Sequence, residues 1–356
     1  MVTIASFIFV LGILIFIHEL GHFLVAKKAG IRVEKFSLGF PPNIFKHKVG
    51  DTTYCIGLIP LGGYVKMAGD NPLEETAGAP DEFLSKPIAH RAAVIFAGPF
   101  MNYVLAMVVS FGLFAFGGGE FITDPDRVMI GQIQPDSPAE LAGLQTGDQI
   151  ISVDGHPVSS FDSLRYRIYA KPAQAVELVW LHDNDTLSTS AVTAVRPLRN
   201  AEGGVDSVGQ LGFTEMTLGR VQYSLGEALV QAVNDTHWKV AATAFFLKEF
   251  ITGNISSKAV GGPIFIAQLS GEQARRGAYA LFNLIALLSI NLAVLNVLPI
   301  PILDGGHLVF LAIEKIRGKT LSIKARTWAQ QIGLVAILGL ILMVTYNDIA
   351  RLFLGY

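Results

Sequence analysis

The sequence predicts an α-helical polytopic membrane protein with about four transmembrane helices, a membrane-associated β-hairpin or sheet, and one soluble α+β domain. Hydrophobic residues make up 51% of the chain and charged residues only 16%, whereas a soluble domain carries about 25% charged residues. Mean hydropathy is +0.47. A spanning helix needs about 20 mostly apolar residues, and four segments meet or approach this length: 2–26, 92–116, 281–311 and 329–354.

Charge and cysteine content exclude several classes of protein. The net charge is −2 and the isoelectric point is about 6.4, so nothing favours a nucleic-acid partner. The single cysteine, Cys55, excludes an intrachain disulfide and a cysteine-rich zinc site. The first apolar segment has no positively charged start and no clear cleavage site, so we expect a retained helix and not a signal peptide.

Basic residues predict the orientation in the membrane. Lysines and arginines follow the first span, precede the second, and lie between the third and fourth. Loops rich in these residues face the cytoplasm. The sequence therefore predicts that residues 117–280 and both termini lie on the outer side.

The segment between the first two spans has a β-like pattern. Residues 32–68 contain β-branched and aromatic residues, interrupted by glycines and a proline, which predicts short strands joined by tight turns. The segment is too apolar for a solvated loop, so we expect it to enter the membrane with its backbone shielded by protein or facing a wet cavity. Residues 71–87 are polar and predict a linker.

A more polar stretch follows the second span. After a turn-rich linker at 117–126, residues 128–213 predict a strand, a short helix starting near Ser137, another strand with a turn at Asp154 and Gly155, and strands at 176–181 and 209–213. Residues 224–252 have a helical period that predicts an amphipathic helix on the outer membrane surface. The alternative is a helix packed on the soluble domain.

These elements give an expected division of the chain. It consists of a first span at 1–27, a β region and linker at 28–91, a second span at 92–116, an α+β domain at 117–216, an amphipathic membrane-surface segment at 217–277, a broken third span at 278–316, a cytoplasmic loop at 317–327 and a fourth span at 328–356.

The first span contains the motif HELGH. On a helix, His18 and His22 lie on one face, where both imidazoles reach one zinc ion, and Glu19 is near enough to reach a zinc-bound water. An ionised side chain at mid-membrane costs about 2.5–3.5 kcal/mol, so a carboxylate between two histidines indicates function. The alternative is a pair of core histidines with a glutamate that reaches toward the helix end.

A third zinc ligand is expected in the late stretch NVLPIPILDGGHLVF. Asp304 places a carboxylate in an apolar segment, and the prolines before it break the helix. The glycines after it permit close approach of the backbone. Two alternatives remain open: Asp304 caps the following helix without a metal, or His307 is the ligand instead.

These motifs together resemble the site-2 protease family of intramembrane zinc proteases, most closely its bacterial branch of sigma-E regulators. The stretches FSLGF, GLIPLGGYVKM, AGPFMNY and GGPIFIAQ support the resemblance. It implies that His18, His22 and Asp304 bind Zn²⁺ and that Glu19 is the catalytic acid and base. It also implies that a β-hairpin at residues 54–67 and Asn296 contact the substrate; the hairpin residues expected to do so are Tyr54, Ile56, Leu58, Gly62 and Gly63.

The stretch SPAELAGLQTGDQIISVDG resembles a bacterial PDZ domain, which implies a peptide or protein ligand. Two such domains occur in the nearest relatives, whereas this sequence shows one. The family resemblance further implies a bacterial inner-membrane enzyme that cleaves single-span membrane proteins, such as anti-sigma factors or remnant signal peptides.

Two other classes of function fit parts of the sequence. Polar groups in spans also line ion paths, as in a zinc transporter, although the chain shows no repeated halves of the kind transporters carry. A catalytically silent membrane scaffold with a binding domain is the third possibility. The intact Glu19 favours the protease.

Overall fold

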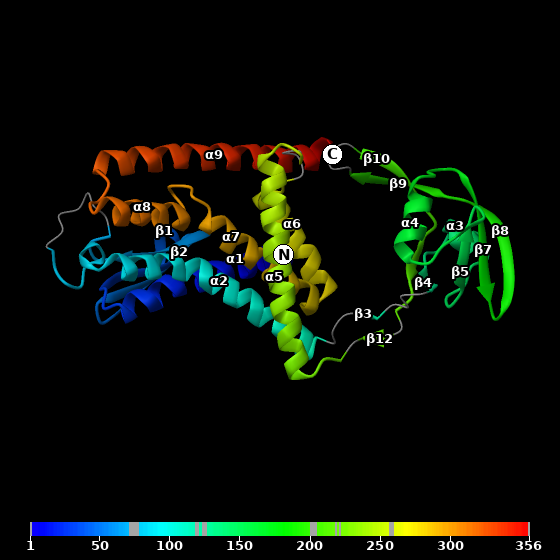
Figure 1. The fold of residues 1–356 in the computed structure, drawn as a ribbon, viewed down its shortest axis with the longest axis horizontal. Helices are drawn as coiled ribbons and strands as arrows, with labels where there is room; N and C mark the ends of the chain where they lie inside the picture. The colour runs from blue at the N-terminus through cyan, green and yellow to red at the C-terminus, as the bar shows by residue number, and fades with distance from the viewer. Residues whose placement is uncertain are drawn as a thin grey trace. The chain divides into compact units, whose positions relative to one another are not determined.

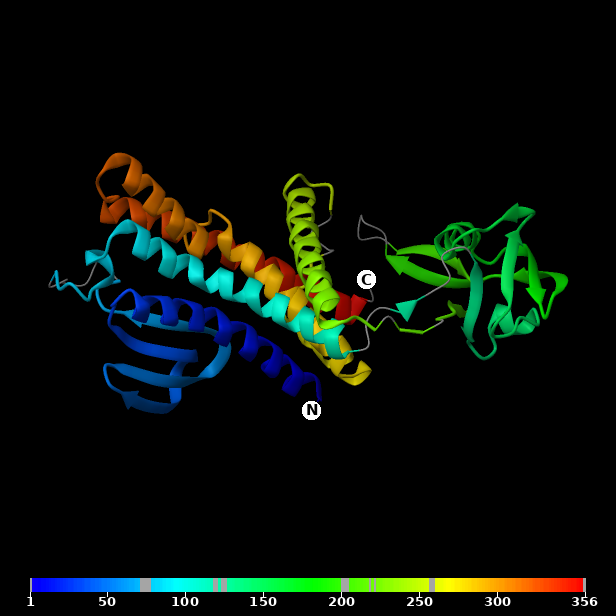
Figure 2. The same ribbon diagram turned by 60° about the horizontal axis from the view of Figure 1, so that its bottom comes forward.

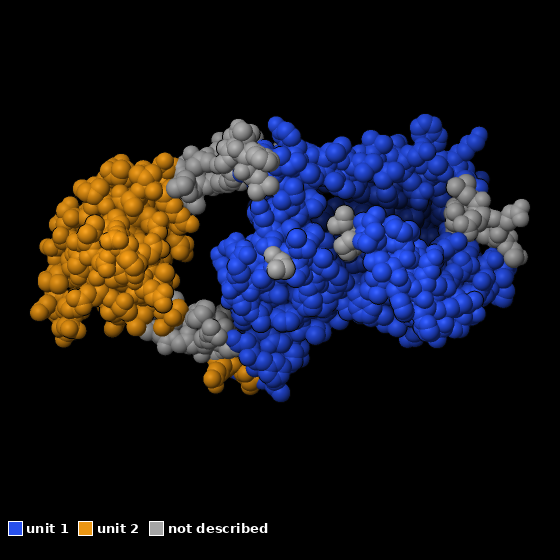
Figure 3. Space-filling view, turned by 180° about the vertical axis from the view of Figure 1, so that it is seen from behind, with its two compact units in different colours: residues 1–117, 225–355 blue, residues 118–224, 356 orange. Residues whose placement is uncertain are grey.

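The chain forms two compact units. The computed structural model describes residues 2–70, 78–117, 121–122, 127–199, 205–217, 219–220, 222–255 and 260–354. The larger unit comprises residues 1–117 and 225–355, and the smaller one residues 118–224 (Figure 3). Residues 71–77 of the linker expected at 71–87, and residues 118–120 and 123–126 of the linker expected at 117–126, lie outside the described residues. After the first gap the chain forms a short 3-10 helix, η1 (Phe83–Ser85).

Four helices of the larger unit are long and apolar enough to cross a membrane, which confirms the predicted number of spans. They are α1 (Val2–Lys28), α2 (Ile88–Phe116), α7 (Ala278–Val297) and α9 (Ile323–Leu354). Even α7, with 20 residues, reaches about 30 Å because an α-helix rises about 1.5 Å per residue. The chain is therefore a multi-pass membrane protein.

The third expected span, 281–311, is wrong in its bounds. The helix α7 ends at Val297 and a separate helix, α8 (Asp304–Arg317), follows after a turn. Pro299 and Pro301 lie in that turn. Because proline has no backbone N–H to donate, neither position can continue the helical hydrogen bonds. The break leaves Asp304 at the first position of α8.

The helix α5 (Leu225–Ile251) belongs to the larger unit and crosses α2 and α7 (Figures 1 and 2). Several of its polar side chains point inward: Ser110 Oγ donates to Asp235 at 2.7 Å, and Thr243 Oγ1 donates to Asn291 on α7 at 2.7 Å. Its apolar side is exposed, with Trp238 the clearest case at 68%. The alternative of a helix packed on the soluble domain is therefore wrong, and the exposed apolar side suits lipid.

The shorter helix α6 (Pro263–Arg276) is attached to the C-terminal part of α9. The buried carboxylate of Asp348 accepts hydrogen bonds from the backbone N–H groups of Gly262 and Phe265, both at 2.9 Å. These two amides belong to the first turn of α6, where helix N–H groups have no partner inside the helix. The GGPIFIAQ stretch thus marks a helix start that is capped from another helix.

The segment between α1 and α2 forms a sheet beside α1 (Figure 2), built from β1 (Val33–Val49) and β2 (Thr52–Met67). The prediction of short strands with tight turns is wrong, because each strand is long and bends once. Phe36 pairs with both Val65 and Tyr54. The four arms consequently lie in the order 62–67, 33–38, 52–57 and 43–49.

Two glycines explain the bends. Gly39 has φ of +87°, a conformation that residues with a Cβ rarely adopt. A Cβ on Gly57 would overlap the backbone of Gly39 and Phe40. The register shifts around these residues produce bulges, which bend strands and disturb the simple alternation of side chains.

The smaller unit is an α+β domain, as predicted. Its main sheet has the order β11-β4-β5-β7-β8, with β6 paired to β5, and two further pairs join β9 to β10 and β3 to β12. The strands and helices are β3 (Phe121–Ile122), β4 (Val128–Ile133), α3 (Pro138–Leu141), β5 (Gln149–Val153), β6 (His156–Pro157), α4 (Phe161–Tyr169), β7 (Ala175–His182), β8 (Asp185–Val192), β9 (Ala194–Arg199), β10 (Val205–Gln210), β11 (Phe213–Glu215) and β12 (Gly219–Arg220).

The core of this domain joins the sheet to α4. Ile130, Ile150 and Leu178 on the strands are fully buried with Leu164 of the helix, and burying each such side chain contributes about 1.5–3 kcal/mol. The expected helix near Ser137 is confirmed, because the Ser137 side chain accepts from the N–H of Glu140 at the start of α3.

The strand expected at 209–213 is wrong. This stretch contains the end of β10 and the start of β11, separated by Leu211 and Gly212. Gly212 has φ of +89°. Both carbonyls at the turn accept hydrogen bonds: Gly212 O from the N–H of Gln134, before α3, and Leu211 O from the N–H of Ala139, in α3. The backbone therefore changes direction where the sequence alone suggested continuity.

Candidate metal centre

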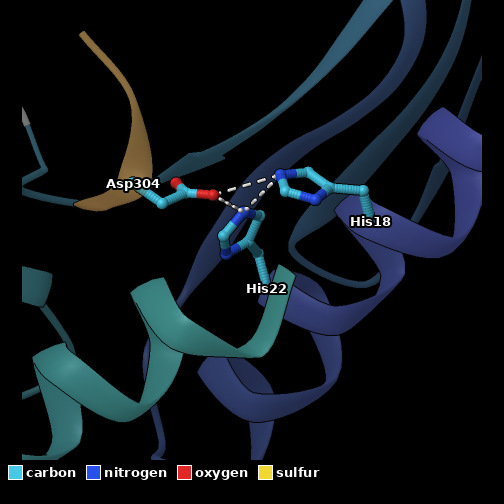
Figure 4. Close-up of side chains that lie close together, drawn as sticks. All are labelled: His18, His22 and Asp304. Atoms are coloured by element: carbon cyan, nitrogen blue, oxygen red, sulfur yellow. Dashed lines mark hydrogen bonds and ion pairs between the residues drawn. The ribbon is translucent and has the colours of Figure 1, made fainter. Parts of the chain in front are cut away.

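Three metal-ligand side chains meet inside the larger unit. His18 and His22 project from one face of α1 toward Asp304 of α8 (Figure 4). The two Nε2 atoms lie 3.2 Å apart. Asp304 Oδ2 lies 3.2 Å from Nε2 of His18 and 3.6 Å from Nε2 of His22. The structure thus brings together residues that are about 280 positions apart in the sequence.

This triangle has the dimensions that zinc requires. Zinc–ligand bonds of about 2.0–2.1 Å at tetrahedral angles place neighbouring ligand atoms about 3.3–3.4 Å apart. The three measured separations lie within a few tenths of an ångström of that value. Asp304 Oδ2 is also buried without a regular hydrogen bond, which a metal would satisfy. Three protein ligands leave a fourth position for water or substrate.

Glycines bring Asp304 to this position. A Cβ on Gly305 would overlap the carbonyl of Val297, and one on Gly306 would overlap the carbonyl of Ile300. The first turn of α8 can therefore pack against the end of α7 only if both residues lack side chains.

The capping alternative for Asp304 is wrong. Leu303, and not Asp304, is the N-cap residue of α8, and the Asp304 carboxylate faces the two histidines. The rival ligand His307 lies outside the cluster that the described residues form. Its ring contacts Phe310 edge-on, with centroids 6.0 Å apart.

A buried ion pair fixes α8 against α2. Arg91 binds Glu314 with two hydrogen bonds, Nη1 to Oε2 at 3.0 Å and Nη2 to Oε1 at 2.5 Å. Both side chains are almost fully buried, and such two-point contacts set direction as well as distance. The pair orients the helix that begins with Asp304.

One side of α2 contacts both imidazoles. Val94 O lies 2.8 Å from Nδ1 of His22, and Asn102 Nδ2 lies 3.2 Å from Nδ1 of His18. Between them, a Cβ on Gly98 would lie 2.8 Å from Cε1 of His18 and still closer to His22. The sequence analysis noted the AGPFMNY stretch but missed these contacts, because the motif does not reveal which side of the helix meets α1.

The Glu19 side chain lies beside the metal cluster and next to the edge of the sheet. It is 9% exposed. A Cβ on Gly63 would lie 3.0 Å from Glu19 Cγ. The arm 62–67 is the outer arm of the sheet on this side, so its free edge faces Glu19.

The expected substrate-contacting residues lie in different places. Asn296 is at the site, with Nδ2 3.5 Å from Nε2 of His18, and Gly63 lies beside Glu19. Ile56 pairs on both sides, with Leu38 and Phe45. The Ile56 backbone is therefore already used by β1.

The remaining hairpin residues make other contacts and are not placed at the triangle. Tyr54 also pairs on both sides and packs on Phe23 and Phe36, with ring centroids 6.0 Å apart in each case. Leu58 is 59% exposed. Gly62 lies against the ring of Phe40, which a side chain there would displace.

The smaller unit contains a separate cavity of about 320 Å³ between α4 and the turn that leads into β11. Its apolar lining comes from Leu164, Ile168 and Phe213, and Arg165 and Arg196 add positive charge. Since β11 is the end strand of its sheet, one of its edges is free to face this cavity. The sequence analysis did not locate this groove.

Two buried histidines on a helix that can span a bilayer lie at zinc distances from a carboxylate, and a glutamate lies beside them. These features define a membrane-embedded metallohydrolase. Residues 6–340 match the family model "Peptidase family M50", and the chain belongs to this family. It is a zinc metalloprotease, as predicted, which argues against the transporter and scaffold alternatives.

Relatives match over nearly the full length. A protein named putative zinc metalloprotease from Agrobacterium fabrum is 35% identical over 98% of this chain and 96% of its own. The Bacillus subtilis protein named regulator of sigma-W protease RasP is 31% identical over 99% of both chains. Among solved structures, the PDZ domain of an SdrC-like protein from Listeria monocytogenes overlaps 26% of this chain and 90% of its own, with 19% identity and a TM-score of 0.21.

We predict that Gly98→Ala weakens zinc binding about 10- to 100-fold, the range found when groups around metal ligands are disturbed. The added methyl group would displace both imidazoles. Zinc affinity of the purified protein, measured by chelator competition, checks this. Gly112→Ala is the matched control, because it lies on the same helix with open space around it. Equal affinities for the two variants would contradict the prediction.

Proposed function

We propose that this protease hydrolyses a peptide bond within or near the membrane segment of single-span proteins. His18, His22 and Asp304 bind the zinc ion, and Glu19 is the catalytic acid and base. One observation carries the proposal: the ligand triangle has zinc dimensions and includes two residues of a helix long enough to span the membrane. Anti-sigma factors and remnant signal peptides are substrates of this kind.

The residues divide the chemistry between them. Zinc, when bound, supplies a water of lowered pKa and polarises the scissile carbonyl. Glu19 takes a proton from the attacking water and then donates it to the leaving amine. Asn296, at the rim of the triangle, has amide N–H groups that can donate to a substrate carbonyl.

A helical substrate has to unwind before it can be cut, because its peptide bonds are occupied by its own hydrogen bonds. Each unpaired backbone group in lipid costs several kcal/mol. The free edge of the arm 62–67 offers a substitute, since an extended segment can add to it as a further strand. Support comes from Gly63 on this arm, where an added Cβ would lie 3.0 Å from Glu19 Cγ. A segment held on this edge would lie next to the catalytic carboxylate.

We predict that the Glu19→Gln variant binds zinc normally but cleaves a single-span model substrate about 10²- to 10⁴-fold more slowly, the usual loss for a missing general acid–base. Cleavage in detergent and zinc content are measured on the same sample. Glu34→Gln, an acid on β1 that pairs with Arg32, is the control and should cleave at the normal rate. Undiminished cleavage by Glu19→Gln would refute the assigned role.

Strand addition makes a separate prediction about the substrate. Backbone N-methylation at successive positions beside the cut site should slow cleavage at every second residue, because alternate N–H groups of a strand face the same edge. Each loss should be roughly 2- to 10-fold, corresponding to about 0.5–1.5 kcal/mol per hydrogen bond. The rates are measured with a set of synthetic substrates. A uniform effect, or one with a helical period, would rule out edge pairing.

We further propose an orientation in the bacterial inner membrane. Basic residues follow α1, precede α2 and lie between α8 and α9, which places these loops in the cytoplasm. The metal site then opens toward the cytoplasm, and the smaller unit and both termini lie in the periplasm. There the groove beside β11 would bind the free carboxyl end of a trimmed substrate, with Arg165 or Arg196 supplying the positive charge.

One experiment tests both the orientation and the ligand. A peptide with an apolar carboxyl end should bind right-side-out vesicles roughly 10-fold more tightly than its carboxyl-amidated form, since a hydrogen bond to a charged group contributes about 1.5–3 kcal/mol. Fluorescence anisotropy of labelled peptide gives both affinities. Equal affinity for the two peptides would exclude carboxylate binding, and binding restricted to inside-out vesicles would reverse the orientation.

A further inference from the structure

Beside the metal cluster, the buried side-chain amide of Asn102 on α2 has only one of its two ends in a hydrogen bond. Asn102 is completely buried, and its Nδ2 lies 3.2 Å from Nδ1 of His18. Its Oδ1 is buried without a hydrogen-bond partner in the part of the chain that the structure describes. A buried carbonyl oxygen left without a donor is costly, by about 1–3 kcal/mol, so this arrangement calls for an explanation.

The two histidines need a defined tautomer to bind zinc. An imidazole that binds metal through Nε2 keeps its proton on Nδ1, and that proton needs an acceptor. His22 meets this requirement, because its Nδ1 lies 2.8 Å from the carbonyl oxygen of Val94, which can only accept. At His18 the corresponding neighbour is the Asn102 amide. Because an amide can either donate or accept, the orientation of the Asn102 amide decides which nitrogen of His18 carries the proton.

We infer that Asn102 is a positioning residue: its Oδ1 accepts the Nδ1–H of His18 and thereby keeps His18 Nε2 free for zinc. This rests on the proposed role of His18 as a zinc ligand. A half-turn of the side-chain amide exchanges O and NH₂ within almost the same volume. The far end of the amide has no hydrogen-bond partner among the described side chains, so contact with His18 alone selects the orientation.

The opposite amide orientation would favour the other tautomer of His18. With NH₂ toward Nδ1, the His18 proton would lie on Nε2 and block the nitrogen that zinc needs. The Asn102 backbone is held by Ser289 Oγ on α7, which donates to its carbonyl at 2.8 Å. The choice between the two tautomers therefore depends on the side-chain amide.

Two substitutions separate accepting from donating. Leucine at position 102 has a similar volume and no polar atom, and aspartate can only accept when ionised. We expect Asn102→Leu to weaken zinc binding about 10- to 100-fold, and Asn102→Asp to bind within about threefold of the wild type or more tightly. Gly112→Ala, on the same helix with open space around it, is the control and should leave zinc affinity unchanged.

The measurements use the full chain in detergent. Zinc affinity is determined by chelator competition, and the absorption spectrum of the Co²⁺-loaded protein reports tetrahedral coordination independently of activity. Wild-type affinity in Asn102→Leu would overturn the inference. So would equal losses in Asn102→Leu and Asn102→Asp, because a donor or a purely steric role would then explain both.

His18→Ala distinguishes this inference from the proposed function. If the wild-type protein binds no zinc, or if His18→Ala binds it as tightly as the wild type, the assignment of the metal ligands fails. If His18→Ala loses zinc while Asn102→Leu retains it, the ligands stand and only the role of Asn102 is wrong.

Discussion

The structure depends on contacts that offset the cost of placing polar groups inside apolar helices. A charged side chain at mid-membrane costs about 2.5–3.5 kcal/mol, and α1 carries Glu19 between two histidines. Here the imidazoles face Asp304, and the Glu19 side chain lies against the β1–β2 sheet at Gly63. Each of these contacts requires a second element to pack tightly against α1. The positions of α2, α8 and the β1–β2 sheet follow from this requirement.

Small residues make that tight packing possible. Gly98 leaves room for the imidazoles, Gly63 for Glu19, and Gly305 with Gly306 for the first turn of α8. In lipid, helices gain little from hydrophobic burial against one another and rely on close contact and hydrogen bonds. The glycines therefore set how near the polar groups come. The Arg91–Glu314 pair then fixes the direction of α8.

Local patterns predicted most of the candidate site. His18, Glu19 and His22 are close in sequence, and helical geometry places both histidines on one face without any tertiary information. The helix break before Asp304 follows from two prolines. The contributions of Val94, Gly98 and Asn102 could not be predicted in the same way. They depend on which side of α2 faces α1, and an almost uniformly apolar helix does not reveal that side.

The sheet and α5 show two further limits. Bulges near Gly39 and Gly57 interrupt the alternation that marks a strand, so two long strands appear in the sequence as several short ones. In α5 the amphipathic pattern was evident, but a pattern does not say whether the polar or the apolar side faces the protein. In this structure the polar side faces the protein, where Asp235 and Thr243 form hydrogen bonds.

The distance along the chain between the ligands affects biosynthesis. The ribosome completes His18 and His22 early, whereas Asp304 is added only after most of the polypeptide has been made. Until then the nascent chain holds two of the three side chains in the cluster. A truncated translation product that ends before α8 therefore lacks the carboxylate that completes the cluster.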